Sequence, residues 1–578
     1  MDKIRRNDLD LLKMIAIIAV VFYHFGFLKY GYLGVDIFLV VSGYLTGKSL
    51  LFKLRRDDTF SFFEFIVSKL TRFLPVLCIG CVVSLFFGYF FMLPDDFENL
   101  SESVVASLCF SNNILAFLTT KDYWNVSNNF RPLMHTWYLG ILFEFYIVIG
   151  CIVKIFYKMQ KREKNIVFAV LAFSAFSLIL YFSPFFSSSS KFYLIPFRFF
   201  EFGFGFLLIK LKDCGDKKLL KSLFCLSFLL LILLVFLPFD IFASSIRLFA
   251  VVLFTSLIVF FNFPLNINSK FFLLGKGSYS IYIWHQIILA IYRYCNYLGL
   301  NLISVLWILV FISAISFVTY VFVENKRVFK PYFAISAIML AFSLFVYTKA
   351  GVVRDVPELG IQKNNTYRNM NAAYCDRIYS YDKDFTESNK IKILVLGNSF
   401  ARDFANILLE SSYSAQVDLS YSFDLKVSLK QRIEQADYIF IFDSIVFPNE
   451  KIRPHDDLIQ RLIDCGYDIK SDKLYGIGTK NFGFSMGPYY VRRFTNGYYQ
   501  QKNKLDSAFI EQNEIDKKFY GNHFVDLITP IYLDGLIEIF NKNKQFISAD
   551  GAHLTYWGGV MYAKILDLGT FFDSEEKR

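Results

Sequence analysis

Two side chains that could do chemistry interrupt an apolar segment near the amino terminus, LLKMIAIIAVVFYHF at residues 11–25. They are Lys13 and His24, eleven residues apart. Eleven residues of α-helix return to within about 20° of the starting direction, so both are predicted to share one helix face, about 16 Å apart along the axis. Asp10 falls near that face. Ionisable groups inside a bilayer are costly and by default mark a function or a packing pair. The alternatives are snorkelling of Lys13 to lipid headgroups and an interfacial place for His24.

A second set of reactive side chains stands in the last third of the chain. The segment KILVLGNSFARDF (392–404) predicts a strand, a tight turn at Gly397 and a helix that begins at Ser399. A hydroxyl there meets the helix dipole and free backbone N–H groups, which can stabilise an oxyanion; a simple N-cap is the alternative. In SADGAHLTYWGG (548–559), Asp550 stands three residues before His553 and can orient its imidazole. The three residues predict a Ser–His–Asp nucleophile.

Further ionisable residues stand inside or at the ends of apolar runs, and they form a predicted polar site within the membrane: Asp36, His135, Arg198, Glu201 and His285. Arg198 and Glu201 are three residues apart, which predicts a buried ion pair. Arg72 opens the segment RFLP (72–75), where an arginine can bind phosphate.

The elements that must position these residues change along the chain. Of its 578 residues, 55% are hydrophobic and 70 are phenylalanine, an excess over the 45–50% apolar content of soluble domains. The excess ends near residue 350. The composition therefore predicts a membrane domain followed by a soluble one.

Long apolar runs predict about eleven membrane spans. They lie near residues 10–28, 33–52, 73–93, 133–153, 165–183, 193–209, 222–238, 244–262, 272–295, 302–323 and 332–348. Residues 103–117 are short and interrupted by polar groups, so they are predicted to be interfacial. Basic residues gather in alternate loops, which places the amino terminus in the cytoplasm. An odd number of spans then places the carboxy-terminal domain outside the cytoplasm.

Charge and cysteine content exclude other classes. The net charge of +11 does not indicate nucleic acid, because the basic residues are confined to short loops between apolar runs. Nine cysteines are too few for a disulfide-dense scaffold, and the pair Cys78 and Cys81 has no second pair or histidine cluster, so no metal site is predicted. Cys375 and Cys465 can form a disulfide if their domain faces an oxidising compartment.

From about residue 391, strands alternate with helical patterns, which predicts a parallel sheet covered on both faces. The β-rich runs are KILVLG (392–397), AQVDLSY (415–421), YIFIFD (438–443), KLYGIG (473–478) and NHFVDL (522–527). Residues 350–390 read as a polar linker, preceded by an additional membrane helix at 331–349.

Lys13, His24 and the RxxP motif from Arg72 to Pro75 resemble the acyltransferase-3 family of bacterial membrane O-acyltransferases. The resemblance covers most of residues 8–330 and predicts such a domain at residues 1–330. The resemblance implies a bacterial inner-membrane protein with a periplasmic carboxy-terminal domain. It also implies transfer of an acyl group, usually acetyl, from cytoplasmic acetyl-CoA to an acceptor outside. Lys13 and Arg72 would hold the phosphates of the donor. His24 would transfer a proton or carry the acyl group transiently. No bound cofactor is implied, since acetyl-CoA is a substrate.

Residues 391–578 resemble an SGNH hydrolase-type domain with an α/β/α, flavodoxin-like fold. Gly397-Asn398-Ser399 stands where that family has Gly-Asp-Ser, and Asp550 and His553 stand in its last block. The later oxyanion-hole asparagine has a candidate in Asn481. The region of Asp443 and Ser444, where that asparagine is expected, carries none.

Together these features predict an enzyme that acetylates a sugar hydroxyl of a surface polysaccharide or a lipid-linked oligosaccharide, with lipopolysaccharide O-antigen as the first choice. Peptidoglycan is the alternative acceptor. Two other classes remain open. One is a transporter or flippase with an appended binding domain, and the other is an esterase that removes acetyl groups.

Overall fold

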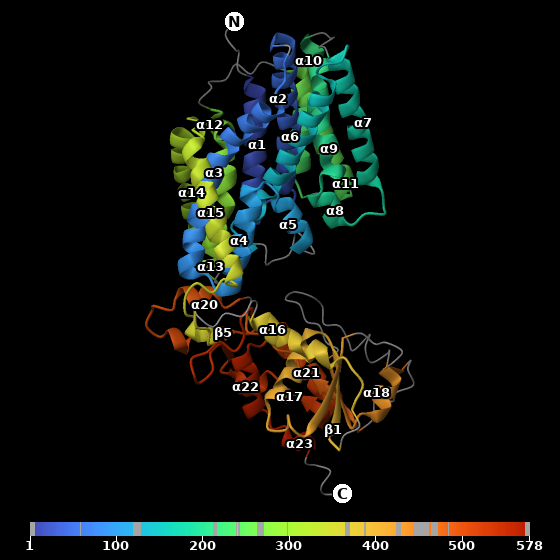
Figure 1. Cartoon of the computed structure of the whole chain (residues 1–578), viewed down its shortest axis with the longest axis vertical. Coiled ribbons are helices and arrows are strands. Elements are labelled where there is room, and N and C mark those ends of the chain that lie inside the picture. Colours follow the sequence, from blue (N-terminus) through green and yellow to red (C-terminus); the bar gives the residue numbers. More distant parts are fainter. Residues whose placement is uncertain are drawn as a thin grey trace. The chain divides into compact units, whose positions relative to one another are not determined.

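The computed structural model describes residues 6–57, 59–119, 129–211, 217–238, 240, 243–262, 271–296, 299–326, 328–363, 370–386, 389–423, 429–442, 462–463, 472–483 and 485–572. The chain divides into two compact units (Figure 1). The first comprises residues 1–90 and 96–347, and the second comprises residues 91–95 and 348–578.

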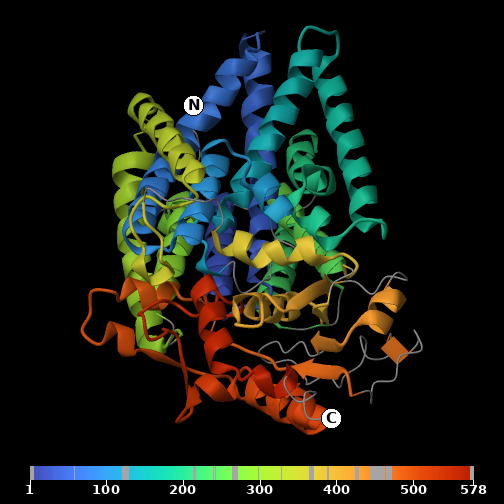
Figure 2. The same ribbon diagram turned by 60° about the horizontal axis from the view of Figure 1, so that its bottom comes forward.

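The first unit is helical. Its long helices are α1 (Asn7–His24), α2 (Gly34–Asp57), α3 (Phe62–Phe91), α6 (Trp137–Phe156), α7 (Arg162–Phe182), α9 (Ile195–Leu207), α10 (Lys217–Phe236), α11 (Ser244–Phe261), α13 (Ser278–Cys295), α14 (Leu302–Thr319) and α15 (Lys330–Thr348). Shorter helices connect them: α4 (Pro94–Leu108), α5 (Asn112–Thr119), α8 (Ser188–Tyr193) and α12 (Leu273–Lys276). Helix α9 packs against both α2 and α7 (Figures 1 and 2).

Among the described residues, nine helices are long and apolar enough to cross a membrane, compared with the eleven spans predicted. The two predicted spans outside this set correspond to α1 and α13. Helix α1 carries Asp8, Asp10 and Lys13, and α13 carries His285 and Arg293 among several tyrosines. Chemistry-bearing side chains therefore lower the apolar character of the two helices that also hold His24 and His285.

The segment 103–117 forms parts of α4 and α5, neither of which is long enough to span a bilayer. The chain breaks between them at Phe110, where φ is +53°. Asn112 and Asn113 are buried among the helices of the first unit. The Asn113 amide donates hydrogen bonds to Glu144 Oε1 at 3.0 Å and to the Tyr193 carbonyl at 3.1 Å. The hydrogen bonds of Asn113, one of the polar residues that interrupt the apolar run, therefore hold α5 against the rest of the helical unit.

The second unit is built on a five-stranded parallel sheet in the order β2-β1-β3-β4-β6. The strands are β1 (Ile391–Gly397), β2 (Val417–Ser422), β3 (Tyr438–Phe442), β4 (Leu474–Ile477) and β6 (Phe524–Val525). Each coincides with one of the five predicted β-rich runs. Counted along the chain, this order is 2-1-3-4-5, the doubly wound, flavodoxin-like order.

Helices cover both faces of this sheet. On one face, Ile393 and Val395 of β1 join the core that includes Phe404 of α17 (Ser399–Glu410). On the other, Leu394 and Leu396 pack with residues of α18 (Leu429–Gln435). This alternation explains why residues 393–396 of β1 form an unbroken apolar run, as expected for a parallel strand buried on both sides. The remaining helices are α16 (Met370–Asp376), α20 (Gly487–Val491), α21 (Ser507–Tyr520), α22 (Tyr556–Ile565) and α23 (Gly569–Phe572).

Two features of the second unit differ from the sequence expectation. A three-stranded antiparallel sheet, β5-β8-β7, was not predicted, because its strands are only two or three residues long: β5 (Lys502–Lys504), β7 (Tyr532–Leu533) and β8 (Leu536–Glu538). The described part of the predicted linker, 350–390, packs into the second unit. Its apolar residues Val352, Val356, Ile361 and Ile378 belong to the same core as β1.

Candidate functional site

Ser399 is held at the start of α17 by a turn that requires a glycine. Gly397 ends β1 with φ of +129°, a conformation that side chains disfavour. A Cβ at Gly397 would also lie 2.6 Å from the carbonyl oxygen of Phe442. Asn398 caps the helix, because its Oδ1 accepts a hydrogen bond from the backbone N–H of Phe400 at 2.9 Å. The half-buried Ser399 is therefore the first residue of the helix.

The position of Ser399 in the sheet is also distinctive. Strand β1 has β2 on one side and β3 on the other, so the strand order reverses beside β1. Doubly wound sheets bind their ligands outside the carboxyl ends of the strands at such a switch point. Ser399 follows the carboxyl end of β1 directly.

His553 and Asp550 form a directed pair. His553 Nδ1 lies 2.6 Å from Asp550 Oδ2, while Asp550 Oδ1 accepts hydrogen bonds from the backbone N–H groups of Ala552 and His553 at 2.9 and 2.8 Å. Partial desolvation favours the neutral carboxyl of Asp550, whose side chain is about half exposed, but the hydrogen bonds that it accepts and the nearby His553 outweigh this effect and lower the pKa of Asp550 to about 2. Since Nδ1 donates to this carboxylate, Nε2 is left to act as a base.

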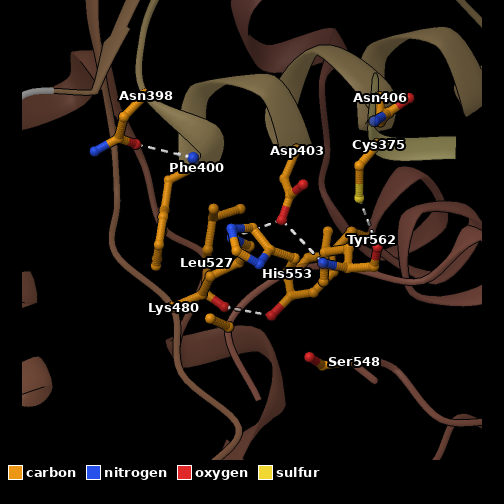
Figure 3. A network of polar contacts seen from close by, with 12 residues as sticks. Cys375, Asn398, Phe400, Asp403, Asn406, Lys480, Leu527, Ser548, His553 and Tyr562 are labelled. Atoms are coloured by element: carbon orange, nitrogen blue, oxygen red, sulfur yellow. Dashed lines mark hydrogen bonds and ion pairs between the residues drawn. The ribbon is translucent and has the colours of Figure 1, made fainter. Parts of the chain in front are cut away.

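The structure brings the Ser399 helix and the His553 loop together. The ring of Phe400, the residue after Ser399, lies 6.2 Å from the imidazole of His553 between ring centres. On the next turn of α17, Asp403 Oδ2 accepts a hydrogen bond from the backbone N–H of Leu554 at 2.9 Å (Figure 3). Within the described residues, no hydrogen bond joins Ser399 to His553 in this state.

Asn481 lies in the loop after β4, beside the His553 loop. Its neighbour Phe482 donates a backbone hydrogen bond to the Gly551 carbonyl at 2.7 Å. The Asn481 side-chain oxygen accepts a hydrogen bond from the backbone N–H of Gly483 at 2.9 Å. Among the described residues the Asn481 amide N–H₂ has no acceptor, so it can serve as an oxyanion donor. Asp443 and Ser444 lie outside the described residues.

Two residues that sequence reasoning missed stand between these segments. Lys480 Nζ lies 2.8 Å from Asp403 Oδ2, and both side chains are fully buried. The same Nζ lies 3.7 Å from the centre of the Phe400 ring, a cation–π contact. The sequence did offer one signal for these two residues, their position beside the motifs. Asp403 stands four residues after Ser399, and Lys480 directly precedes Asn481.

Cys375 is buried in the second unit, and its thiol donates to the carbonyl of Leu554 at 3.8 Å. Its predicted disulfide partner, Cys465, lies outside the described residues. Within the described part of the chain, no group of three or more His, Cys, Asp or Glu residues could hold a metal ion.

In the first unit, His24, His135 and His285 form a histidine cluster. The ring centres of His24 and His285 are 5.1 Å apart, and those of His135 and His285 are 5.3 Å apart. His285 Nδ1 donates to the Tyr282 carbonyl at 2.6 Å, which leaves its buried Nε2 as an acceptor without a partner among the described residues. These histidines come from α1, α13 and the 3-10 turn η3 (Met134–Thr136).

The other predicted polar residues form a separate cluster. Arg198 Nε lies 3.0 Å from Glu201 Oε1, which is the predicted ion pair. Arg198 also binds Asp36 of α2, and its guanidinium lies 5.4 Å from the ring centre of Trp137. All three charged side chains are buried. The predicted single polar site is therefore two clusters, one of histidines and one built around Arg198.

The predicted donor-binding cations occupy different helices. Lys13 on α1 pairs with Asp10 at 2.6 Å. Arg72 on α3 is exposed, and the Glu324 carboxylate lies within electrostatic range of both Lys13 and Arg72.

Lys69 was missed, although its three-residue spacing places it on the same face of α3 as Arg72. Its Nζ lies 4.4 Å from the Tyr146 ring centre and 3.4 Å from Thr46 Oγ1. No carboxylate pairs with Lys69 or Arg72 among the described residues, so the two cations remain available to an anion.

Comparison with known protein families supports the predicted acyltransferase-3 character of the first unit. A family model described as an acyltransferase domain matches residues 6–323. The chain is 27% identical over 309 residues to the peptidoglycan O-acetyltransferase OatA of Listeria monocytogenes, covering 49% of each chain. It is 28% identical over 309 residues to the O-acetyltransferase OatA of Staphylococcus aureus, covering 49% of this chain and 50% of that protein.

A third relative is the putative membrane-bound transacylase BcsY of Komagataeibacter xylinus, at 30% identity over 205 residues, or 35% of this chain and 50% of that one. The chain therefore spans about half the length of the curated relatives it matches. No solved structure matches it significantly. Because the family model covers more than half of the sequence, this multi-pass membrane protein belongs to the acyltransferase-3 family.

Proposed function

We propose that the protein transfers an acetyl group from cytoplasmic acetyl-CoA across the membrane to a hydroxyl of a surface glycan, through a covalent acyl-enzyme at Ser399. Family membership and the named relatives support acyl transfer. The observation that carries the role of the second unit is the placement of Ser399 at the switch point of a doubly wound sheet, next to the loop with the His553–Asp550 pair.

The chemistry at Ser399 follows from the orientation of the imidazole. In the first step, Ser399 Oγ attacks the acyl carbonyl carbon, His553 Nε2 takes the hydroxyl proton, and the leaving group departs with that proton. In the second step, a sugar hydroxyl oxygen attacks the acyl-serine and His553 takes its proton. Ser399 Oγ then leaves and recovers the proton from His553. The ionised Asp550 stabilises the imidazolium formed in each step.

Backbone N–H groups at the start of α17 and the Asn481 amide are the proposed oxyanion donors. They would hold the negative charge that develops on the acyl oxygen in both steps. The helix dipole adds to this effect, since its positive end points at the same place.

In the first unit, the proposal assigns donor phosphates to Lys13, Lys69 and Arg72. Lys69 and Arg72 have no carboxylate partner among the described residues, which suits phosphate oxygens, whereas Lys13 is proposed from the family resemblance and is paired with Asp10 in this structure. His24 is the proposed group that takes the acyl or a proton on its way outward. His285 contacts it by ring packing, and a fixed tautomer on His285 leaves a lone pair inside the cluster.

The proposed topology has eleven spans, with α1 and α13 crossing the membrane inside the bundle. Charges that make them less apolar are tolerated where they face other helices rather than lipid. Leu9, Leu12, Ile15 and Ala16 of α1 are buried, which supports such a place. The positive loops then put the amino terminus in the cytoplasm and Ser399 outside.

The acceptor is proposed to be a glycan outside the cytoplasmic membrane. The motif GNSFARDF favours lipopolysaccharide O-antigen or a similar polysaccharide, whereas the printed name of the Listeria relative favours peptidoglycan. Mass analysis of both glycans, from cells with and without the gene, separates these acceptors. A loss of acetyl groups on deletion supports transfer, and a gain supports an esterase.

The test of the enzyme proposal is a comparison of wild-type protein with Ser399→Ala in membranes supplied with acetyl-CoA. We expect acetylated acceptor only with the wild type, and equal amounts of folded protein for both. A transporter would consume no acetyl-CoA in either case. Undiminished acceptor acetylation by Ser399→Ala would contradict the proposed role of this serine.

A further inference from the structure

One buried carboxylate joins three segments of the second unit. Asp403 lies one helical turn after Ser399 on α17. Its Oδ2 accepts a hydrogen bond from the backbone N–H of Leu554 at 2.9 Å and lies 2.8 Å from Lys480 Nζ (Figure 3). The helix that begins at Ser399, the loop that holds His553 and the loop after β4 therefore meet at a single oxygen atom.

A gain in folding stability does not by itself explain why Asp403 and Lys480 form a buried ion pair. Removing two charges from water costs several kcal/mol for each ion, and apolar pairs of the same size are often as stable or more stable. Asp403 and Lys480 are nevertheless both fully shielded from solvent. Buried pairs of this kind can instead fix one arrangement of the elements that they join.

The contact with Leu554 shows which arrangement is fixed. Leu554 directly follows His553, so a restraint on its backbone N–H restrains the backbone from which the imidazole projects. Asp550 orients the imidazole within the same loop but does not tie that loop to α17. Asp403 supplies this tie, because it belongs to the same helix as Ser399.

We propose that Asp403 is a positioning residue that sets the distance between Ser399 and the His553 imidazole, and that Lys480 neutralises and orients its carboxylate. This inference rests on the proposed acyl-enzyme function of Ser399. A displacement of about 1 Å between a nucleophile and its base can cost about 10²-fold in rate. The hydrogen bond to Leu554 is therefore expected to act on the rate of serine acylation more than on ligand affinity.

Two double variants separate positioning from packing. Asp403→Asn with Lys480→Met and Asp403→Leu with Lys480→Met both remove the two buried charges. Only the asparagine variant keeps a side-chain oxygen that can accept from Leu554. The readout is the rate at which full-length protein in detergent is labelled at Ser399 by an alkyl fluorophosphonate. In that reaction the Oγ–P bond forms, fluoride leaves and His553 accepts the hydroxyl proton.

We expect the asparagine variant to label within about threefold of wild type. The leucine variant should label about 10- to 100-fold more slowly at saturating probe, with an unchanged probe affinity and a similar Tm. If the leucine variant does not fold, Asp403→Val with Lys480→Met replaces it and must show the same loss. Equal labelling rates for the acceptor and non-acceptor variants would overturn the proposal.

A second readout does not depend on the reaction. In protein labelled with ¹⁵N-histidine, six histidines contribute signals, and His553→Gln identifies the imidazole N–H that donates to Asp550. This signal should persist in the asparagine variant and be lost to exchange in the leucine variant. If wild-type Ser399 does not react with the probe, the proposed function fails, and the imidazole signal still decides whether Asp403 holds the loop. An identical signal in both variants would contradict the positioning role.

Discussion

The imidazole Nδ1 of His553 lies 2.6 Å from the carboxylate Oδ2 of Asp550, three residues earlier in the same loop. This contact fixes which ring nitrogen carries the proton, and therefore which one can act as a base toward Ser399. Asp550 is itself held by two backbone N–H groups, so the pair is aligned before any substrate binds.

Asp550→Asn should slow acylation of Ser399 by about 10³- to 10⁴-fold, because the amide favours the wrong imidazole tautomer. Fluorophosphonate labelling of the full-length protein measures this rate. Asp567→Asn, a surface substitution in the same unit, is the matched control and should label normally. A loss of less than tenfold for Asp550→Asn would contradict the base role of His553.

Acid should weaken the second unit through the same carboxylate. The pKa of Asp550 is lowered from 3.8 to about 2, so its contribution to the free energy of unfolding is present above about pH 4 and lost as the pH falls toward 2. Asp550→Asn should remove this part of the pH dependence. Thermal unfolding between pH 2 and 6, followed by the ¹⁹F resonance of fluorotryptophan at Trp557, reports on this unit. If the Tm of wild type and of Asp550→Asn falls in parallel from pH 6 to pH 2, Asp550 does not contribute to the pH dependence of stability.

His24→Ala should abolish acetylation of the glycan while leaving fluorophosphonate labelling of Ser399 unchanged, since the two residues belong to different units. His285→Ala should reduce acetylation as well, through its contact with His24. His523→Ala removes a ring that stacks on Tyr475 at 4.4 Å and serves as a control with normal transfer. Normal acetylation by His24→Ala would remove this residue from the proposed route.

Lys69→Ala and Arg72→Ala should each raise the KM for acetyl-CoA by about 10- to 100-fold, the loss expected for a charge-assisted hydrogen bond to phosphate. Lys69→Arg, which keeps the charge, should recover most of the affinity. Initial rates of acetyl-CoA consumption provide both constants. An unchanged KM for both alanine variants would show that the donor binds elsewhere.

Arg198→Leu should destabilise the first unit by about 3–5 kcal/mol, because Asp36 and Glu201 would be left as buried acids without their cation. Adding Asp36→Asn and Glu201→Gln to Arg198→Leu should restore most of this loss. The Tm of the purified protein in detergent checks both statements. A triple variant no more stable than Arg198→Leu would argue against electrostatics as the cause.

Much of the second unit could be predicted, because a strand buried on both faces leaves a continuous apolar run and Gly397-Asn398-Ser399 marks the end of one. The three very short strands of the antiparallel sheet leave no such run. The packed segment around Val352 and Ile361 was read as linker because its few apolar residues stand among polar ones, and only the three-dimensional core reveals their partners.

The residues of the candidate sites also fall into two groups, those that local spacing predicts and those that only the folded structure brings together. Local spacing was sufficient for Arg198 with Glu201 and for Asp550 with His553, since each pair is three residues apart. Two other contacts depend on helix packing, which local sequence spacing does not reveal. They are the ion pair of Asp36 with Arg198 and the ring contact of His24 with His285. Lys480 and Asp403 were missed for that reason too, as they are 77 residues apart and meet only in the folded unit.

The most direct measurement of the central claim follows acetyl from one side of the membrane to Ser399 on the other. Sealed vesicles with the cytoplasmic face outward receive labelled acetyl-CoA, and mass spectrometry examines the tryptic peptide 393–402 after a short incubation. The account predicts labelled acetyl on Ser399 when the donor is on the cytoplasmic face, with none in His24→Ala. Acetylated Ser399 only when the donor is on the opposite face, or an unmodified serine in vesicles that acetylate the acceptor, would contradict it.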